Sequence, residues 1–175
     1  ITIMDAVVKN DKSQRLGGVV GQAYSVDNCH TNAKVDFAVS KYTKRVKVVY
    51  AGGIAGYSNV GVTNSTLDAA VALNVVPTLT ATADNINKGD AGVRLAGIVA
   101  QVGAVAGTQT VTNCSTTNTS SVTLTTNNTL ENMVGGIVAR GNNGIASCTN
   151  NATVTLNVPT ANAGTNICYV AGVAC

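Results

Sequence analysis

Two adjacent residues, Cys29 and His30, are the first candidates for chemistry in this sequence. A cysteine nucleophile needs an imidazole ring within hydrogen-bond reach of its sulfur, and His30 is the only histidine in the chain. If the pair lies in a strand, the two side chains point to opposite faces, so we expect no such contact. A single histidine also excludes a metal site built on two histidines.

The acidic residues do not form a catalytic set either. A glycosidase or a lyase needs clustered carboxylates on one face, whereas the acids occupy different positions of the sequence repeat described below. They are Asp5, Asp11, Asp27, Asp36, Asp68, Asp84, Asp90 and Glu131. Residues 84–90 are similar in composition to a calcium loop, but Ile86 and Lys88 stand where oxygen ligands are required. We therefore predict no catalytic residue, no metal, no cofactor and no enzymatic activity.

Three of the five cysteines, Cys29, Cys114 and Cys148, share one position of the repeat. Cys114 and Cys148 belong to consecutive repeats, and neighbouring strands would bring their α-carbons within the roughly 4.4–6.8 Å that a disulfide tolerates. The alternative is a column of buried free thiols, since cysteine packs well as a small apolar residue. An odd number of cysteines leaves at least one thiol free or paired outside this segment.

Basic residues gather around an insertion at residues 38–49. They are Lys34, Lys41, Lys44, Arg45 and Lys47. Such a patch would attract an acidic glycan or an anionic surface, although alternating Lys and Val is also typical of a solvated, hairpin-like insertion. We expect no nucleic-acid partner, because the net charge is only +3 and rings for base stacking are scarce.

Five asparagines lie in glycosylation sequons. Asn64 and Asn113 occupy a repeated position, where stacking of the repeats accounts for them. Asn118, Asn127 and Asn151 lie in Thr/Asn-rich stretches and are the candidates for glycosylation if the source glycosylates in a secretory pathway.

All these residues are placed by a sequence repeat that is marked by a glycine-centred apolar segment. Its copies are residues 16–21, 51–56, 95–100, 134–139 and 170–175. The second glycines, at 18, 53, 97, 136 and 172, are 35–44 residues apart, a spacing typical of solenoids and arrays. The uneven period indicates a fixed core unit with variable insertions, which we expect to carry any recognition.

An Asn-Cys-like pair and an alternating triplet follow each glycine segment. The pairs are 28–29, 64–65, 113–114 and 147–148, and the triplets are 35–37, 71–73, 122–124 and 154–156. The outer residues of each triplet are large and apolar, as in a strand with one buried face. The pattern therefore predicts three short strands in each repeat, one at the glycine segment, one at the pair and one at the triplet.

Such short strands enclose a core only if the repeats stack. We expect two columns, Val35 over Val71 over Val122 over Val154, and Phe37 over Leu73 over Leu124 over Leu156. Val71, Val122, Leu124 and Ile137 should be buried, with Thr123 and Thr155 on the outer face. The prediction is an all-β fold, a parallel β-solenoid of about four full coils of 35–44 residues with variable loop insertions, forming one segment over residues 1–175.

Residues 52–57 (Gly-Gly-Ile-Ala-Gly-Tyr) and 135–139 (Gly-Gly-Ile-Val-Ala), with the Asn-Cys and Val-Thr-Leu segments that follow, resemble a known repeat. They are similar to the GLUG-type repeats of bacterial surface proteins, adhesins and relatives of secreted IgA-cleaving peptidases. The resemblance covers nearly the whole chain and implies a β-helical stalk. In such proteins any enzymatic activity sits in other domains, and no catalytic motif of those domains is present here.

Composition favours an extracellular or cell-surface location. Charged residues make up 11% of the chain and aromatic residues 3%, so Thr, Asn and Ser must make the surface polar, as is common in extracellular repeats. No apolar run is long enough to span a membrane. The first triplet and the last strand lack polar caps, and we expect further repeats of the same chain or a head-to-tail copy to cover them.

The sequence thus predicts a structural or adhesive repeat region that mediates attachment or forms a stalk, with glycans or a host surface as further partners. One alternative is a self-assembling subunit of an extracellular filament. A second is a glycan-processing β-helix enzyme, for which the required face of acids and bases is not found.

Overall fold

The structure of the chain is a computed structural model. It describes residues 2–3, 7–8, 13–39, 41–42, 48–75, 92–103, 110–127, 131–141, 144–158 and 168–175. Throughout these residues the chain forms short strands joined by bends and no helix. Every pair of neighbouring strands among them is parallel. The all-β class predicted from the sequence is therefore confirmed.

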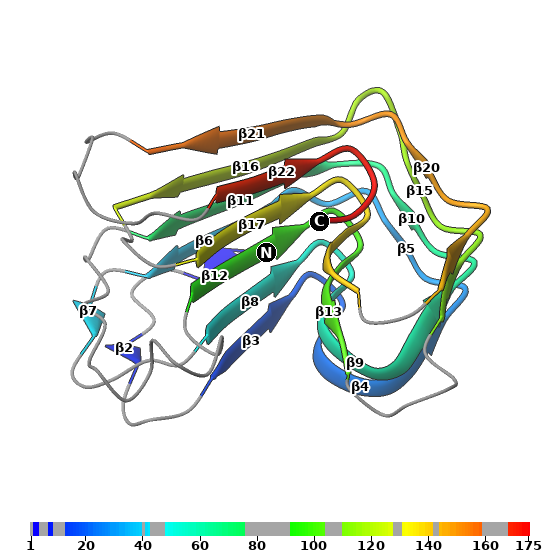
Figure 1. Ribbon diagram of the computed structural model, residues 1–175, viewed down its shortest axis with the longest axis horizontal. Helices are drawn as coiled ribbons and strands as arrows, with labels where there is room; N and C mark the ends of the chain where they lie inside the picture. Colours follow the sequence, from blue (N-terminus) through cyan, green and yellow to red (C-terminus); the bar gives the residue numbers. More distant parts are fainter. Residues whose placement is uncertain are drawn as a thin grey trace.

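Two parallel sheets contain the triplets and the residues that lead into the glycine segments. The triplet sheet consists, in spatial order, of β1 (Thr2–Ile3), β6 (Val35–Val39), β11 (Ala70–Val75), β16 (Ser121–Thr126) and β21 (Thr153–Asn157). The glycine sheet consists of β3 (Gln14–Gly17), β8 (Val48–Gly52), β12 (Gly92–Ala96), β17 (Glu131–Gly135) and β22 (Cys168–Ala171). In both sheets the strands lie in sequence order, which the colours of Figure 1 make visible.

Two further sheets lead the chain from each glycine strand back to the triplet sheet. The curved sheet contains β4 (Val20–Asp27), β9 (Ala55–Thr63), β13 (Val99–Val102), β14 (Thr110–Thr112), β18 (Val138–Arg140) and β19 (Ile145–Ala146). The short sheet contains β5 (His30–Thr31), β10 (Thr66–Leu67), β15 (Ser115–Thr116) and β20 (Thr149–Asn150). Strands β4 and β9 curl through a half-turn in Figure 1, so the sheets surround a common interior.

The predicted columns of the triplet sheet are confirmed by its register. The paired residues are Val35–Val71–Val122–Val154 and Phe37–Leu73–Leu124–Leu156, in strand order. Val71, Val122, Leu124 and Ile137 are fully buried, as predicted. Thr123 and Thr155 alternate with the column residues and are half-buried on the other face of the sheet. The period-two pattern therefore placed the correct residues in the core.

The Asn-Cys pairs correct one part of the sequence prediction, because they form a corner and not a strand. Asn28, Asn64, Asn113 and Ser147 have φ angles of 52°, 50°, 53° and 53°. This left-handed conformation interrupts a strand and is tolerated best by asparagine among residues with a side chain. The chain therefore turns at each pair, from the curved sheet into the short sheet.

Amide side chains at this corner are linked from repeat to repeat. Nδ2 of Asn113 donates to Oδ1 of Asn64 at 2.8 Å, and Nδ2 of Asn64 donates to Oδ1 of Asp27 at 2.8 Å. We call this set the asparagine ladder. It confirms that stacking accounts for Asn64 and Asn113.

The predicted insertions all join the triplet sheet to the glycine sheet. They fall between β6 and β8, between β11 and β12, between β16 and β17, and between β21 and β22. Within the first of them, β7 (Lys41–Tyr42) pairs with β2 (Val7–Val8). Insertions of different length are therefore accommodated at one edge of each repeat, without a shift in the strand register.

The second glycine of each repeat forms a column in which the backbones come too close for any side chain. A Cβ atom at Gly18, Gly53, Gly97 or Gly136 would overlap the carbonyl oxygen of the equivalent glycine in the next repeat. The amide of Gly97 also donates to the carbonyl of Gly135 at 3.2 Å. Glycine is therefore required here by the approach of one repeat to the next.

Gly97→Ala should destabilise the chain by about 3 kcal/mol, because the new methyl group collides with backbone that cannot move away without breaking the stack. Gly144→Ala is the matched control, since no atom lies within 4 Å of the position its Cβ would take. Urea denaturation of both variants gives the two free energies of unfolding. Equal stabilities would contradict the close approach of the repeats.

Candidate functional site

The predicted basic patch is only partly described by the structure. Lys34 is exposed, and its Nζ lies 3.0 Å from Oδ2 of Asp36. The backbone of Lys41 belongs to β7. The remaining members, Lys44, Arg45 and Lys47, lie outside the described residues. The structure thus pairs one basic residue with a carboxylate and leaves the grouping of the others a prediction.

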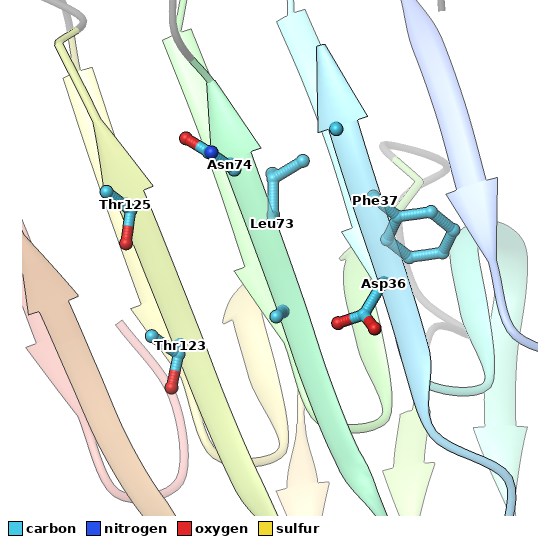
Figure 2. Close-up of a pocket in the computed structure, with 8 residues that line it drawn as sticks. Asp36, Phe37, Leu73, Asn74, Thr123 and Thr125 are labelled. Atoms are coloured by element: carbon cyan, nitrogen blue, oxygen red, sulfur yellow. The ribbon is translucent and has the colours of Figure 1, made fainter. Parts of the chain in front are cut away.

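A hollow of about 300 Å³ on the triplet sheet was not predicted from the sequence. Its lining residues are Asp36, Phe37 and Ala38 of β6, Ala72, Leu73 and Asn74 of β11, and Thr123 and Thr125 of β16. Figure 2 shows these residues on three adjacent strands. Phe37 and Leu73 are almost fully buried, so the accessible groups come from the alternate, outward-facing residues. We call this site the triplet-sheet hollow.

The hollow exists because two alanines stand among larger residues. In the sheet register, Ala72 lies between Asp36 and Thr123, and Ala38 is the neighbour of Asn74. The short alanine side chains leave a depression that the surrounding carboxylate, amide and hydroxyl groups border. The only sign of the hollow in the sequence is the run of Asp, Asn, Thr and Ala at the outward positions of these strands. The same residue types are also typical of a sheet face that only contacts solvent.

The polar groups of the hollow form few hydrogen bonds within the described part of the chain. Oγ1 of Thr125 accepts a weak hydrogen bond of 3.4 Å from Asn157, and Asp36 forms its ion pair with Lys34. The side chains of Asn74 and Thr123 form no hydrogen bond with another described residue. The arrangement offers donors and acceptors to a ligand. It holds a single carboxylate and no histidine or cysteine, so it lacks the carboxylate pair of a glycosidase.

A second cluster, around Arg94 of β12, serves the structure of the chain. Arg94 is only 1% exposed and donates to Glu131 at 3.1 Å, to Tyr50 at 3.3 Å and to Gln101. Its guanidinium also lies over the ring of Tyr50, 5.4 Å from the centroid, and burial raises the pKa of that tyrosine. A buried cation needs such partners, and it ties together the glycine sheet and the curved sheet.

Arg15 and Tyr57 extend this cluster at the same corner. The guanidinium carbon of Arg15 lies 5.0 Å from the centroid of the Tyr57 ring. The rings of Tyr50 and Tyr57 pack edge to face, with centroids 5.6 Å apart. Sequence analysis missed these residues. Arg15, Tyr50 and Arg94 share the repeat position directly before the glycine segment, but the residue type at that position changes from repeat to repeat.

The repeated cysteines are free thiols in the structure. Cys114 is buried, and burial raises the pKa of its thiol to about 11. The sulfurs of Cys114 and Cys148 each donate at 3.5 Å to a backbone carbonyl of the preceding repeat, that of Val62 and that of Val111. A disulfide between Cys114 and Cys148 stays a prediction for oxidising conditions.

The other predicted features have different surroundings. Asn118 and Asn151 are exposed and Asn127 is half-buried, and their glycosylation stays a prediction. His30 is exposed on β5, whereas Cys29 donates to the carbonyl of Asp27 at 3.5 Å. Among the described residues, no three side chains of His, Cys, Asp or Glu are grouped to hold a metal ion. Residues 84–90 lie outside the described part.

Comparison with known proteins identifies no relative. No protein-family model matches the chain, and no curated protein or solved structure is detectably similar to it. Within the part of the chain that the structure describes, no helix has the length and apolarity needed to cross a bilayer.

The two interpretations of the cysteine column differ in their reactivity. If the thiols are free, iodoacetamide should label exposed Cys168 rapidly in the native chain and Cys114 at least about a hundredfold more slowly, because only about one thousandth of a thiol with a pKa near 11 is ionised at pH 8. Cys114 labelling should rise with pH up to that pKa. Peptide mass spectrometry measures both rates.

A second, isotopically distinct label added in guanidinium without reductant provides the control. Free Cys114 and Cys148 then react at once. Resistance of both residues until a reductant is added would contradict the free thiols and establish the disulfide.

Proposed function

We propose that the chain is a segment of a parallel β-solenoid that serves as a structural or adhesive repeat region of an extracellular, cell-surface protein. The observation that carries this proposal is the strand order of the triplet and glycine sheets, in which each repeat adds one strand beside that of the repeat before it. A molecule built in this way lengthens with every repeat. Such growth suits a stalk that extends from a surface.

Similarity to GLUG-type repeats in the glycine segments and triplets supports the same proposal. So does the outer face of the triplet sheet, where Ser121, Thr123 and Thr125 of β16 alternate with buried residues. On β16 this surface is polar without being charged. It agrees with the low charged fraction of the chain, 11%.

Recognition in this proposal is carried at the edge where the insertions lie. The strands on either side of them keep their register from repeat to repeat. Segments that join rigid strands can vary without disturbing the stack. The basic insertion that contains Lys41 is the candidate contact for an acidic glycan or a host surface.

The surface location is tested on intact cells of the organism that makes the protein. Antibodies against the chain should label these cells, and an added protease that cannot enter them should remove the label. An antibody against a cytosolic protein serves as the control for cell integrity. A label that appears only after lysis would contradict the proposal.

A filament subunit is the second candidate, and exposed apolar residues on the outermost strands favour it. Tyr24 on β4 is 74% exposed and Val170 on β22 is 52% exposed. Strands β3 and β22 are the edges of the glycine sheet in the described part of the chain. An edge with apolar side chains and unpaired backbone groups invites another strand, from a further repeat or from the opposite end of an identical chain.

If the chain is a filament subunit, the mean mass of the purified chain should rise with its concentration. Val170→Lys should suppress this association, because a lysine on an edge strand opposes strand addition. Ser121→Lys is the matched control, since it places the same charge on the face of β16, an interior strand. Light scattering over a dilution series measures the mass. A monomer at every concentration would exclude the filament and leave the stalk untouched.

A further inference from the structure

We propose that the triplet-sheet hollow is a binding site for an uncharged glycan that lies across strands β6, β11 and β16. The inference rests on the proposed adhesive role and assigns it a ligand class and a place. It differs from the contact at the basic insertion, which would select an acidic partner.

The polar groups of the hollow match the hydrogen-bonding capacity of sugar hydroxyls. The amide of Asn74 both donates and accepts, the hydroxyl of Thr123 does the same, and the carboxylate of Asp36 accepts. A sugar hydroxyl also donates and accepts, so each of these groups finds a complementary partner. Within the described part of the chain, Asn74 and Thr123 form no hydrogen bond with another residue, so their polar groups are not committed to a described neighbour.

The floor of the hollow suits the apolar face of a sugar ring. Ala38 and Ala72 are half-buried and supply methyl groups between the polar residues. Binding sites for small molecules combine such an apolar surface with a few placed polar groups. Neighbouring strands are about 4.8 Å apart, which is close to the length of one hexose unit, so a linear glycan would present successive rings to successive strands.

Charge decides between an uncharged and an acidic glycan. Among the described residues that line the hollow, Asp36 is the one that carries a charge, and Nζ of Lys34 lies 3.0 Å from its carboxylate. An acidic sugar would bring a second negative charge beside this carboxylate, whose ion-pair partner in the described part of the chain is Lys34. The hollow therefore favours a ligand without charge.

A peptide fits the hollow less well than a glycan does. Extended peptides bind to sheets mainly by adding a strand at an edge. The hollow lies on the face of interior strands β6, β11 and β16, whose backbones are paired with neighbours on both sides. Recognition there must run through side chains, which favours a ligand with many hydroxyl groups.

The site is tested by methyl NMR of the purified chain with three uncharged probes, cellohexaose, maltohexaose and chitohexaose, at millimolar concentration. We expect at least one probe to shift the methyl signals of Ala38, Ala72 and Thr123. Thr123→Val should weaken its binding about fivefold through loss of a hydrogen bond, and Ala72→Leu should abolish binding by filling the hollow.

Thr155→Val is the matched control. Thr155 pairs in register with Thr123 on the adjacent strand but does not line the hollow, so this variant should bind as the unmodified chain does. The spectrum of each variant also reports whether it is folded.

Three results would overturn the site. They are the absence of shifts at Ala38, Ala72 and Thr123 with all three probes, an equal loss of binding in Thr155→Val and Thr123→Val, and unchanged binding by Ala72→Leu. Shifts confined to the methyl signals of the basic insertion, such as those of Thr43 and Val46, with a heparin hexasaccharide, and none in the hollow with the uncharged probes, would assign recognition to the basic insertion instead. Because the purified chain is used, failure here leaves the surface location to be decided by the labelling of intact cells.

Discussion

The close approach of one repeat to the next at the glycine column is the constraint on which the other features depend. A Cβ atom at Gly53 or Gly97 would overlap the carbonyl of the next glycine, so the spacing there is set by backbone alone. Once two repeats are held at this spacing, their triplet strands must pair in register, and Val71 and Val122 come into direct contact. The column therefore fixes the stack, while the insertions remain free to differ.

This constraint explains which parts of the fold were predictable from the sequence. A side chain that must face its own equivalent in the next repeat leaves a periodic trace, and the register of Leu124 followed from that trace. Asn64 and Asn113 recur as clearly, but the strand predicted at these positions was wrong. A repeated residue indicates a repeated backbone conformation without specifying which conformation it is. The left-handed φ angle of these asparagines depends on the chain turning, which residue periodicity does not report.

The sites were harder to predict than the fold, and the reason is physical. The triplet-sheet hollow arises where Ala38 and Ala72 lie diagonally across two strands, so it depends on which residues of different repeats become neighbours. Arg94 has the same dependence, since its partners Tyr50 and Glu131 belong to the repeats before and after it. Both features depend on residue types that change from one repeat to the next, and the repeat pattern does not predict such changes.

The asparagine ladder gives the stack an electrical direction. Its amide groups point the same way, from Asn113 through Asn64 to Asp27, so their dipoles add as those of peptide groups do in a helix. The positive ends face the Asp27 carboxylate, whose pKa is lowered by hydrogen bonds from Thr63 and Asn64. Protonation of Asp27 would remove the charge that terminates this row of dipoles. The two ends of the asparagine ladder, at Asp27 and at Asn113, are therefore electrostatically different.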